Sequence, residues 1–183
     1  MIIPTPVFSI PSYVSEQIGG NPEIRIVASR FFDTIPYLPI ISKKIFYELL
    51  NPLLPWRADA AFLCLCMKVV LWSPLAQHDD PQTTDYLAAK RYLSELESGG
   101  VFTMPMLQGR VILSMYEMGH GIYPAAYSSI AASSAHGCAL RLSGQKDAKK
   151  TGKSLTWIEE EEQRRVWWAI VILERYVIVN GSS

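Results

Sequence analysis

Two cysteines in the middle of the chain are the first candidates for metal or redox chemistry. Cys64 and Cys66 form a C-x-C pair, and Cys138 lies far away in the sequence. A zinc site needs convergent ligands, whereas two residues spaced two apart on a helix point to nearly opposite faces. A free cysteine often behaves as a small buried apolar residue. We therefore expect these thiols to be structural and to bind no metal.

The acidic stretch His78-Asp79-Asp80, followed by Asp85, is a second candidate metal site. Helical enzymes that resemble terpene synthases hold magnesium with carboxylates at i, i+1 and i+4, aligned on one helix face to bridge a diphosphate. Here the third acid has the wrong spacing, and Pro81 starts a new helix between the acids. The pattern favours Asp80 as a helix cap over a magnesium ligand.

The other polar candidates have no catalytic partner in the sequence. His120 lies between two glycines that are typical of a helix end, and no serine or cysteine motif marks a nucleophile for it. His136 lies among small residues within a helix, where we expect it to be packed and hydrogen-bonded. The lysine-rich residues 143–154 predict a polar loop without the aromatic side chains that stack on nucleic-acid bases. We therefore expect no enzyme, no catalytic residue and no cofactor.

Length and composition limit the classes of protein to which this chain can belong. The 183 residues carry 17 basic and 17 acidic side chains, and 49% of them are hydrophobic. Zero formal charge argues against a free-standing nucleic-acid-binding protein, and the apolar content argues against disorder. The longest apolar run, Val166–Leu173, is far shorter than the roughly 20 residues of a membrane span. We expect a soluble, intracellular protein with no signal peptide and no disulfide framework.

The periodicity of apolar residues predicts an all-α protein. Prolines at positions 4, 6 and 11 predict an extended arm over residues 1–20. Capping residues, first-turn prolines and apolar spacings of three or four then predict helices that begin near residues 22, 43, 58, 81, 104, 124 and 157. No alternating strand pattern of useful length occurs. The prediction is an irregular bundle of about seven helices.

Two predicted helices have compositions that indicate an internal position. The helix over about Ala58–Trp72 is apolar on nearly every face, and the helix after Pro124 is rich in small residues that allow close helix approach. We expect these positions and the apolar stripes of the other helices to form the core. The residues predicted to be buried are Phe62, Leu63, Val69, Leu107, Val111, Ala131, Trp167, Ile170 and Leu173.

The last predicted helix has the clearest start signal. Thr156 and Glu159 form a capping box, in which each side chain satisfies a backbone donor of the other residue. Favourable i,i+4 ion pairs are expected between Glu160 and Arg164 and between Glu161 and Arg165.

Three segments together resemble the middle homology region of fungal zinc-cluster transcription factors. They are RFFDTIPYLPIISKKIFYELL (residues 30–50), LSMYEMGHGIYPAAYSSIAASSAHGCALRL (113–142) and EEEEQRRVWWAIVILERY (159–176). The resemblance covers about residues 25–178 and implies a helical regulatory domain in the nucleus, over residues 21–183 of this chain. It implies modulation of transcription through contacts within or between molecules, and a small-molecule effector as one means of doing so.

The departures from this family pattern also bear on function. The zinc-cluster module, with its six closely spaced cysteines and two zinc ions, has no counterpart here, so direct DNA binding is not carried over. Family members continue beyond the R-R-x-W-W helix, so the chain looks like the N-terminal half of a larger helical domain. Its expected partners are then other proteins or the rest of that domain. The alternatives are a protein-interaction scaffold without an effector and a truncated fragment without function.

Two consequences of the resemblance concern the last helix. Arg164, Arg165, Trp167 and Trp168 carry much of it, but helix capping, ion pairing and core packing account for all four, so we assign no effector contact. The run Val166–Leu173 is apolar around the whole helix and needs neighbours on every side. With helices missing on one side, we expect an exposed apolar patch there. The purified chain should then self-associate, bind hydrophobic dyes, or need a partner such as the rest of the domain.

Overall fold

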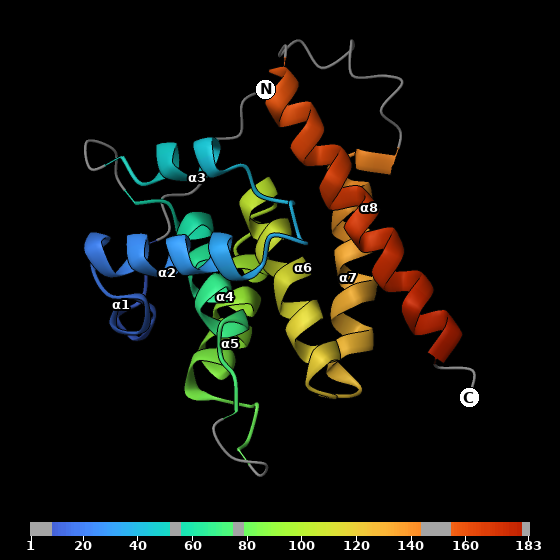
Figure 1. The fold of residues 1–183 in the computed structure, drawn as a ribbon, viewed down its shortest axis with the longest axis horizontal. Coiled ribbons are helices and arrows are strands. Elements are labelled where there is room, and N and C mark those ends of the chain that lie inside the picture. Colours follow the sequence, from blue (N-terminus) through green and yellow to red (C-terminus); the bar gives the residue numbers. More distant parts are fainter. Residues whose placement is uncertain (1–8, 52–55, 75–78, 144–154, 181–183) are drawn as a thin grey trace.

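The computed structural model describes residues 9–51, 56–74, 79–143 and 155–180 (Figure 1). All regular elements in these ranges are helices, which confirms the all-α prediction. They are α1 (Ser12–Ile18), α2 (Asn21–Thr34), α3 (Lys43–Leu49), α4 (Ala58–Val70), α5 (Thr84–Ser98), α6 (Met104–Gly119), α7 (Ala125–Ala139) and α8 (Trp157–Asn180). Most of the predicted lysine-rich loop lies outside the described residues.

The predicted N-terminal arm is wrong over residues 12–18, which form α1. Pro11 lies directly before the helix in an extended conformation. Proline has no backbone N–H, but no hydrogen bond within the helix requires one at this position. Val14 and Ile18 lie four residues apart and are buried together, since α1 packs against α4 and α5. This burial stabilises a seven-residue helix that the proline pattern did not reveal, and it raises the number of described helices to eight.

The centre of the fold is α4, as its all-round apolar composition predicts. It packs against α1, α2, α5 and α6 (Figure 1), and its residues from Asp59 through Met67 are buried. The approach to α6 is close: a Cβ added at Gly109 would lie 2.7 Å from the Phe62 ring. Thus a glycine on one helix and a phenylalanine on the other fix the distance between α4 and α6.

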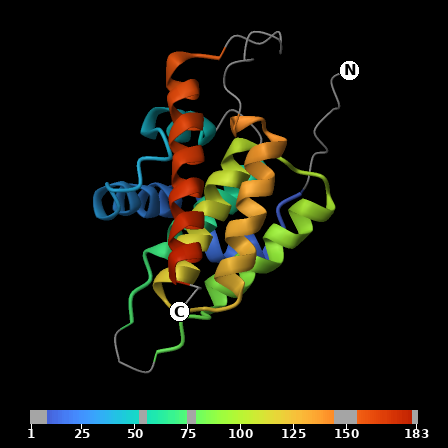
Figure 2. The same ribbon diagram turned by 90° about the vertical axis from the view of Figure 1, so that its right-hand side faces the viewer.

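The small-residue helix α7 packs against α6 and α8 on an outer face of the bundle and does not lie inside it (Figure 2). Ile130 and Gly137 face these two neighbours, and a Cβ at Gly137 would come within 3.2 Å of the Trp167 ring. The predicted burial of Ala131 is wrong because its side of α7 faces solvent. The other predicted core positions are buried except Trp167, which is half-buried on α8.

The start of α8 confirms the capping box. The Glu159 amide donates to Thr156 Oγ1 at 3.3 Å, and the Thr156 amide donates to Glu159 Oε2 at 2.7 Å. Arg165 pairs with Glu161 at 2.7 Å as predicted, whereas Arg164 also pairs with Glu161 and not with Glu160. Both guanidinium groups therefore converge on one carboxylate.

The rest of α8 is covered on one side only (Figure 2). Val166, Ile170 and Leu173 are buried against α6 and α7, but Trp168 is 59% exposed and Ile172 is 64% exposed. The expected core packing of Trp168 is therefore wrong, whereas the expected exposure of apolar residues beside the last helix is confirmed. None of the described helices is long and apolar enough to cross a membrane.

Candidate functional site

The cysteines and acids that suggested metal chemistry are dispersed and engaged elsewhere. Cys64 and Cys66 are buried in α4, and burial raises the pKa of Cys64 to about 12, while Cys138 is exposed on α7. Lys68 pairs with Asp85 at 3.0 Å, whereas the Gln82 amide donates to Asp80. Within the described ranges, no group of three His, Cys, Asp or Glu side chains could hold a metal ion; His78 lies outside them.

The helix cap predicted at Asp80 is wrong, whereas the helix end predicted at His120 is confirmed. Helix α5 is capped by Thr83, whose side chain accepts from the Tyr86 amide at 3.2 Å, so Asp80 is a turn residue and not the helix cap. His120 follows α6, where its ring packs on Tyr116 with centroids 4.3 Å apart. Neither side chain is placed against a nucleophile in the part of the chain that the structure describes.

His136 is packed as predicted but lacks the expected hydrogen bonds. It is 2% exposed, and its ring packs in a T-shaped arrangement with the ring of Phe102, with centroids 5.1 Å apart. Among the described residues, neither ring nitrogen has a hydrogen-bond partner. Burial lowers the pKa of His136 from its ordinary 6.5 to about 4, and the charge of Arg110 acts in the same direction.

This buried imidazole predicts a loss of stability on mild acidification. Between pH 6.5 and pH 4 the unfolded chain binds a proton that folded His136 does not, so stability rises with pH in this window. We expect His136 to contribute a loss of about 2 kcal/mol between pH 7 and pH 5. Urea unfolding at both pH values measures it, and the His136→Phe variant should lose this part of the pH dependence. An identical pH dependence in both proteins would contradict the prediction.

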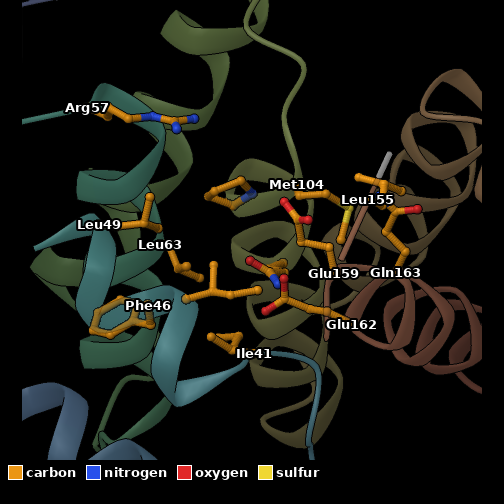
Figure 3. Close-up of a pocket in the computed structure, with 13 residues that line it drawn as sticks. Ile41, Phe46, Leu49, Arg57, Leu63, Met104, Leu155, Glu159, Glu162 and Gln163 are labelled. Atoms are coloured by element: carbon orange, nitrogen blue, oxygen red, sulfur yellow. The ribbon is translucent and has the colours of Figure 1, made fainter. Parts of the chain in front are cut away.

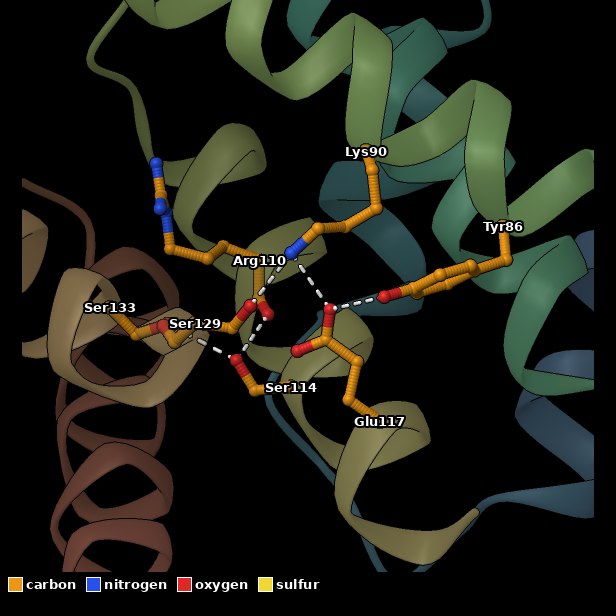
Figure 4. Close-up of polar contacts among 7 residues, drawn as sticks. All are labelled: Tyr86, Lys90, Arg110, Ser114, Glu117, Ser129 and Ser133. Carbon is orange, nitrogen blue, oxygen red and sulfur yellow. Dashed lines mark hydrogen bonds and ion pairs between the residues drawn. The ribbon is translucent and has the colours of Figure 1, made fainter. Parts of the chain in front are cut away.

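A polar network joins α5, α6 and α7 inside the bundle (Figure 4). The carboxylate of Glu117 is fully buried and accepts hydrogen bonds from Lys90 Nζ at 2.8 Å and Tyr86 Oη at 2.9 Å. Lys90 also donates to Ser129 Oγ on α7 at 3.0 Å, which extends the network to the third helix. The network therefore links three helices, although Glu117 Oε2 is buried without a hydrogen-bond partner among the described residues.

A pocket of about 310 Å³ lies where α3, α4, α6 and α8 meet (Figure 3). Phe46 and Leu49 of α3 line one side, Leu63 and Met104 contribute from α4 and α6, and α8 supplies polar groups from the opposite side. The volume is at the lower end of the range for small-molecule sites, and a mainly apolar lining with a few polar groups is typical of them.

Glu162 is the central polar residue of this pocket. It is 9% exposed, and its Oε1 accepts a hydrogen bond from the Ser42 amide at 2.7 Å, which attaches α8 to the segment before α3. Burial raises the pKa of Glu162, and the bond from Ser42 opposes this shift. Next to it, Gln108 donates to the Ile40 carbonyl at 2.8 Å. The pocket is therefore bounded by contacts that hold α8 and residues 40–42 in place.

A second hollow, an apolar groove of about 410 Å³, lies along the outer part of α8. Tyr37 and Pro39 line one wall and Trp168 and Ile172 the other, with Arg164 and Arg165 at its edge. The Pro39 carbonyl accepts a hydrogen bond from Arg165 at 3.5 Å. Residues 37–42 thus border the groove at one end and the pocket at the other.

Comparison with known proteins places this architecture in a family. Residues 28–180 match the fungal specific transcription factor domain. The chain belongs to this family. It is 36% identical to Transcription factor BOA15 of Botryotinia fuckeliana (strain B05.10) over 137 residues, which cover 74% of this chain and 75% of that protein. No solved structure matches it.

The fungal specific transcription factor domain described here is the regulatory domain of a transcription factor, as the three sequence segments indicated. Sequence reasoning missed both Glu117 and Glu162. Glu117 lies on a helix without other charged residues after Arg110, which is a weak signal of burial. Glu162 belongs to a run of four glutamates, and nothing in that run distinguishes the buried one from its half-buried and exposed neighbours.

Proposed function

We propose that this regulatory domain modulates transcription by binding, with a small-molecule effector in the pocket and a protein docked on the outer face of α8. It acts in the nucleus, without catalysis and without a cofactor of its own, and the zero net charge supports a role other than direct DNA contact. The observation that carries the proposal is Glu162, which lines the pocket and at the same time attaches α8 to Ser42.

The two sites share the structural parts through which binding at one can influence the other. Helix α8 supplies Glu162 to the pocket and Trp168 to the groove, and residues 37–42 border both. A ligand that displaces the bond between Glu162 and Ser42 changes how α8 sits on these residues. Binding at the two sites is then coupled to the extent that the ligand prefers one position of α8.

Filling the pocket tests this coupling. With the chain fused between a heterologous DNA-binding module and an activation segment, we expect Met104→Trp to change reporter transcription by about fivefold or more. The indole occupies space that the smaller methionine leaves open, and it acts on α8 as a bound ligand would. Circular dichroism and thermal melting of the purified variant establish that it is folded.

The matched control is Leu87→Trp, which adds an indole at an exposed position of α5. It should leave reporter output unchanged. If folded Met104→Trp also leaves output unchanged, the pocket has no regulatory role. If, in addition, substitutions of Trp168 still alter output, the domain is a protein-interaction scaffold without an effector.

A further inference from the structure

The pocket between α3, α4, α6 and α8 contains a buried carboxylate without a countercharge among the described residues. Glu162 accepts hydrogen bonds from the Ser42 amide and from the Gln108 side chain, and both of these donors are neutral. The ion pairs within the described ranges do not include Glu162. A buried carboxylate is normally paired with a cation, because its loss of hydration is costly. Glu162 is therefore suited to a cation that enters the pocket.

The other charged groups that line the pocket do not supply this cation. Among the described residues of the lining, the single cation is Arg57, and its guanidinium pairs with the buried Asp59. In Figure 3, Arg57 lies beside α4, whereas the carboxylates of Glu159 and Glu162 extend from α8 toward Leu63. Burial raises the pKa of Glu162, and the negative charge of Glu159 acts in the same direction. The α8 wall therefore favours a positive group over a second anion.

The rest of the lining favours an organic cation over a metal ion. Phe46, Leu49, Leu63 and Met104 form an apolar surface opposite the carboxylates. In the part of the chain that the structure describes, no group of three His, Cys, Asp or Glu side chains could hold a metal ion. At about 30 Å³ for each water molecule, the volume of about 310 Å³ corresponds to a ligand of roughly ten non-hydrogen atoms.

We propose that the pocket binds a small amphiphilic organic cation, whose protonated amine pairs with Glu162 and whose apolar body packs on Phe46 and Met104. This inference rests on the proposed function, since it names the chemical class of the effector. A carboxylate can accept about four hydrogen bonds, so the amine donates to Glu162 beside the Ser42 amide or in its place. In the second case α8 loses its bond to Ser42, which is the contact through which the pocket would act.

Isothermal titration calorimetry with three compounds that share one apolar body tests the charge of the ligand. The probes are 4-phenylbutylamine, 4-phenylbutan-1-ol and 4-phenylbutanoate, which end in a cation, a neutral hydroxyl and an anion. We expect the amine to bind at least about tenfold more tightly than the alcohol, and the carboxylate to bind most weakly. Equal affinities, tightest binding of the carboxylate, or an amine that does not bind at about 1 mM would each overturn the proposal.

Two variants on α8 locate the countercharge. Glu162→Gln removes the charge but keeps an oxygen that can accept from the Ser42 amide. It should weaken amine binding at least about tenfold and change alcohol binding by no more than about twofold. The matched control, Glu160→Gln, removes the same charge at an exposed position of the same helix and should leave amine binding within about twofold. Circular dichroism of both variants establishes that they are folded. Amine binding that Glu162→Gln leaves unchanged would place the site elsewhere and overturn the proposal.

The class of the ligand and the regulatory role of the pocket fail in different ways. Met104→Trp fills the pocket and should abolish amine binding in the same titration. If Met104→Trp alters reporter output but the wild-type chain prefers the anion, the class is wrong and the regulatory pocket stands. If the amine binds as expected but reporter output does not respond to Met104→Trp, the cation site stands and the regulatory role fails.

Discussion

Replacing Lys90 with methionine should lower the free energy of unfolding by about 3 kcal/mol. The change removes the cation that lies 2.8 Å from Glu117 and leaves a fully buried carboxylate whose remaining hydrogen bond in this network comes from the Tyr86 hydroxyl. Breaking a buried ion pair by deleting one member is strongly destabilising because the remaining charge keeps its desolvation cost. Urea unfolding followed by circular dichroism at 222 nm measures the effect.

The next residue on the same helix supplies the control. Arg91 pairs with Glu95 at 2.9 Å, but both side chains are well exposed, so Arg91→Met should cost about 1 kcal/mol or less. The contrast between adjacent substitutions isolates burial as the cause. Equal losses in the two variants would show that Glu117 does not carry an uncompensated charge when Lys90 is removed.

Gly109→Ala should destabilise the protein by about 2 kcal/mol, although alanine is the better helix former. A methyl group at this position would lie 2.7 Å from Phe62 Cε1 and 3.3 Å from Cys66 Sγ, so either the buried Phe62 ring shifts or α4 and α6 separate. Overpacking of this kind typically costs about 1–3 kcal/mol, and it acts against the gain of up to about 1 kcal/mol from helix propensity. Thermal melting and urea unfolding both report the change.

Gly119 lies on the same helix and provides the matched substitution. A Cβ there would have no atom within 4 Å, apart from the helix itself and its chain neighbours. Gly119→Ala should therefore be neutral or slightly stabilising. If Gly109→Ala matched it, the close approach of Phe62 would not limit the packing of α4 on α6.

Most of the helices could be predicted from the sequence because the residues that start and stop a helix lie within a few positions of its ends. Thr103 and Thr156 cap the helices that they were expected to cap, since a side-chain oxygen needs only the amides that follow it. The composition of α4 likewise reveals its burial without reference to its neighbours. Helix α1 was missed because its stability comes from Val14 and Ile18 packing on distant helices.

The candidate sites depend on pairs that are remote in sequence. Ser42 and Glu162 are separated by 120 residues, and Lys90 and Glu117 by 27. Neither member of such a pair differs from an ordinary surface residue until the fold brings it to its partner. Ala131 illustrates the same limit for packing: the small residues of α7 indicate close approach, but not which side of the helix receives it.

Because α8 is unevenly buried, the free energy of local opening differs strongly between its two ends. Near its start, the capping box, the bond from Glu162 to Ser42 and the buried Val166 must all break before the backbone opens. After Leu173, the fully buried positions of the described helix end and the half-buried Val177 still packs against the core, so the last turns can unwind at a lower cost than the start. The helix is therefore a rigid extension of the bundle at one end and a fraying segment at the other.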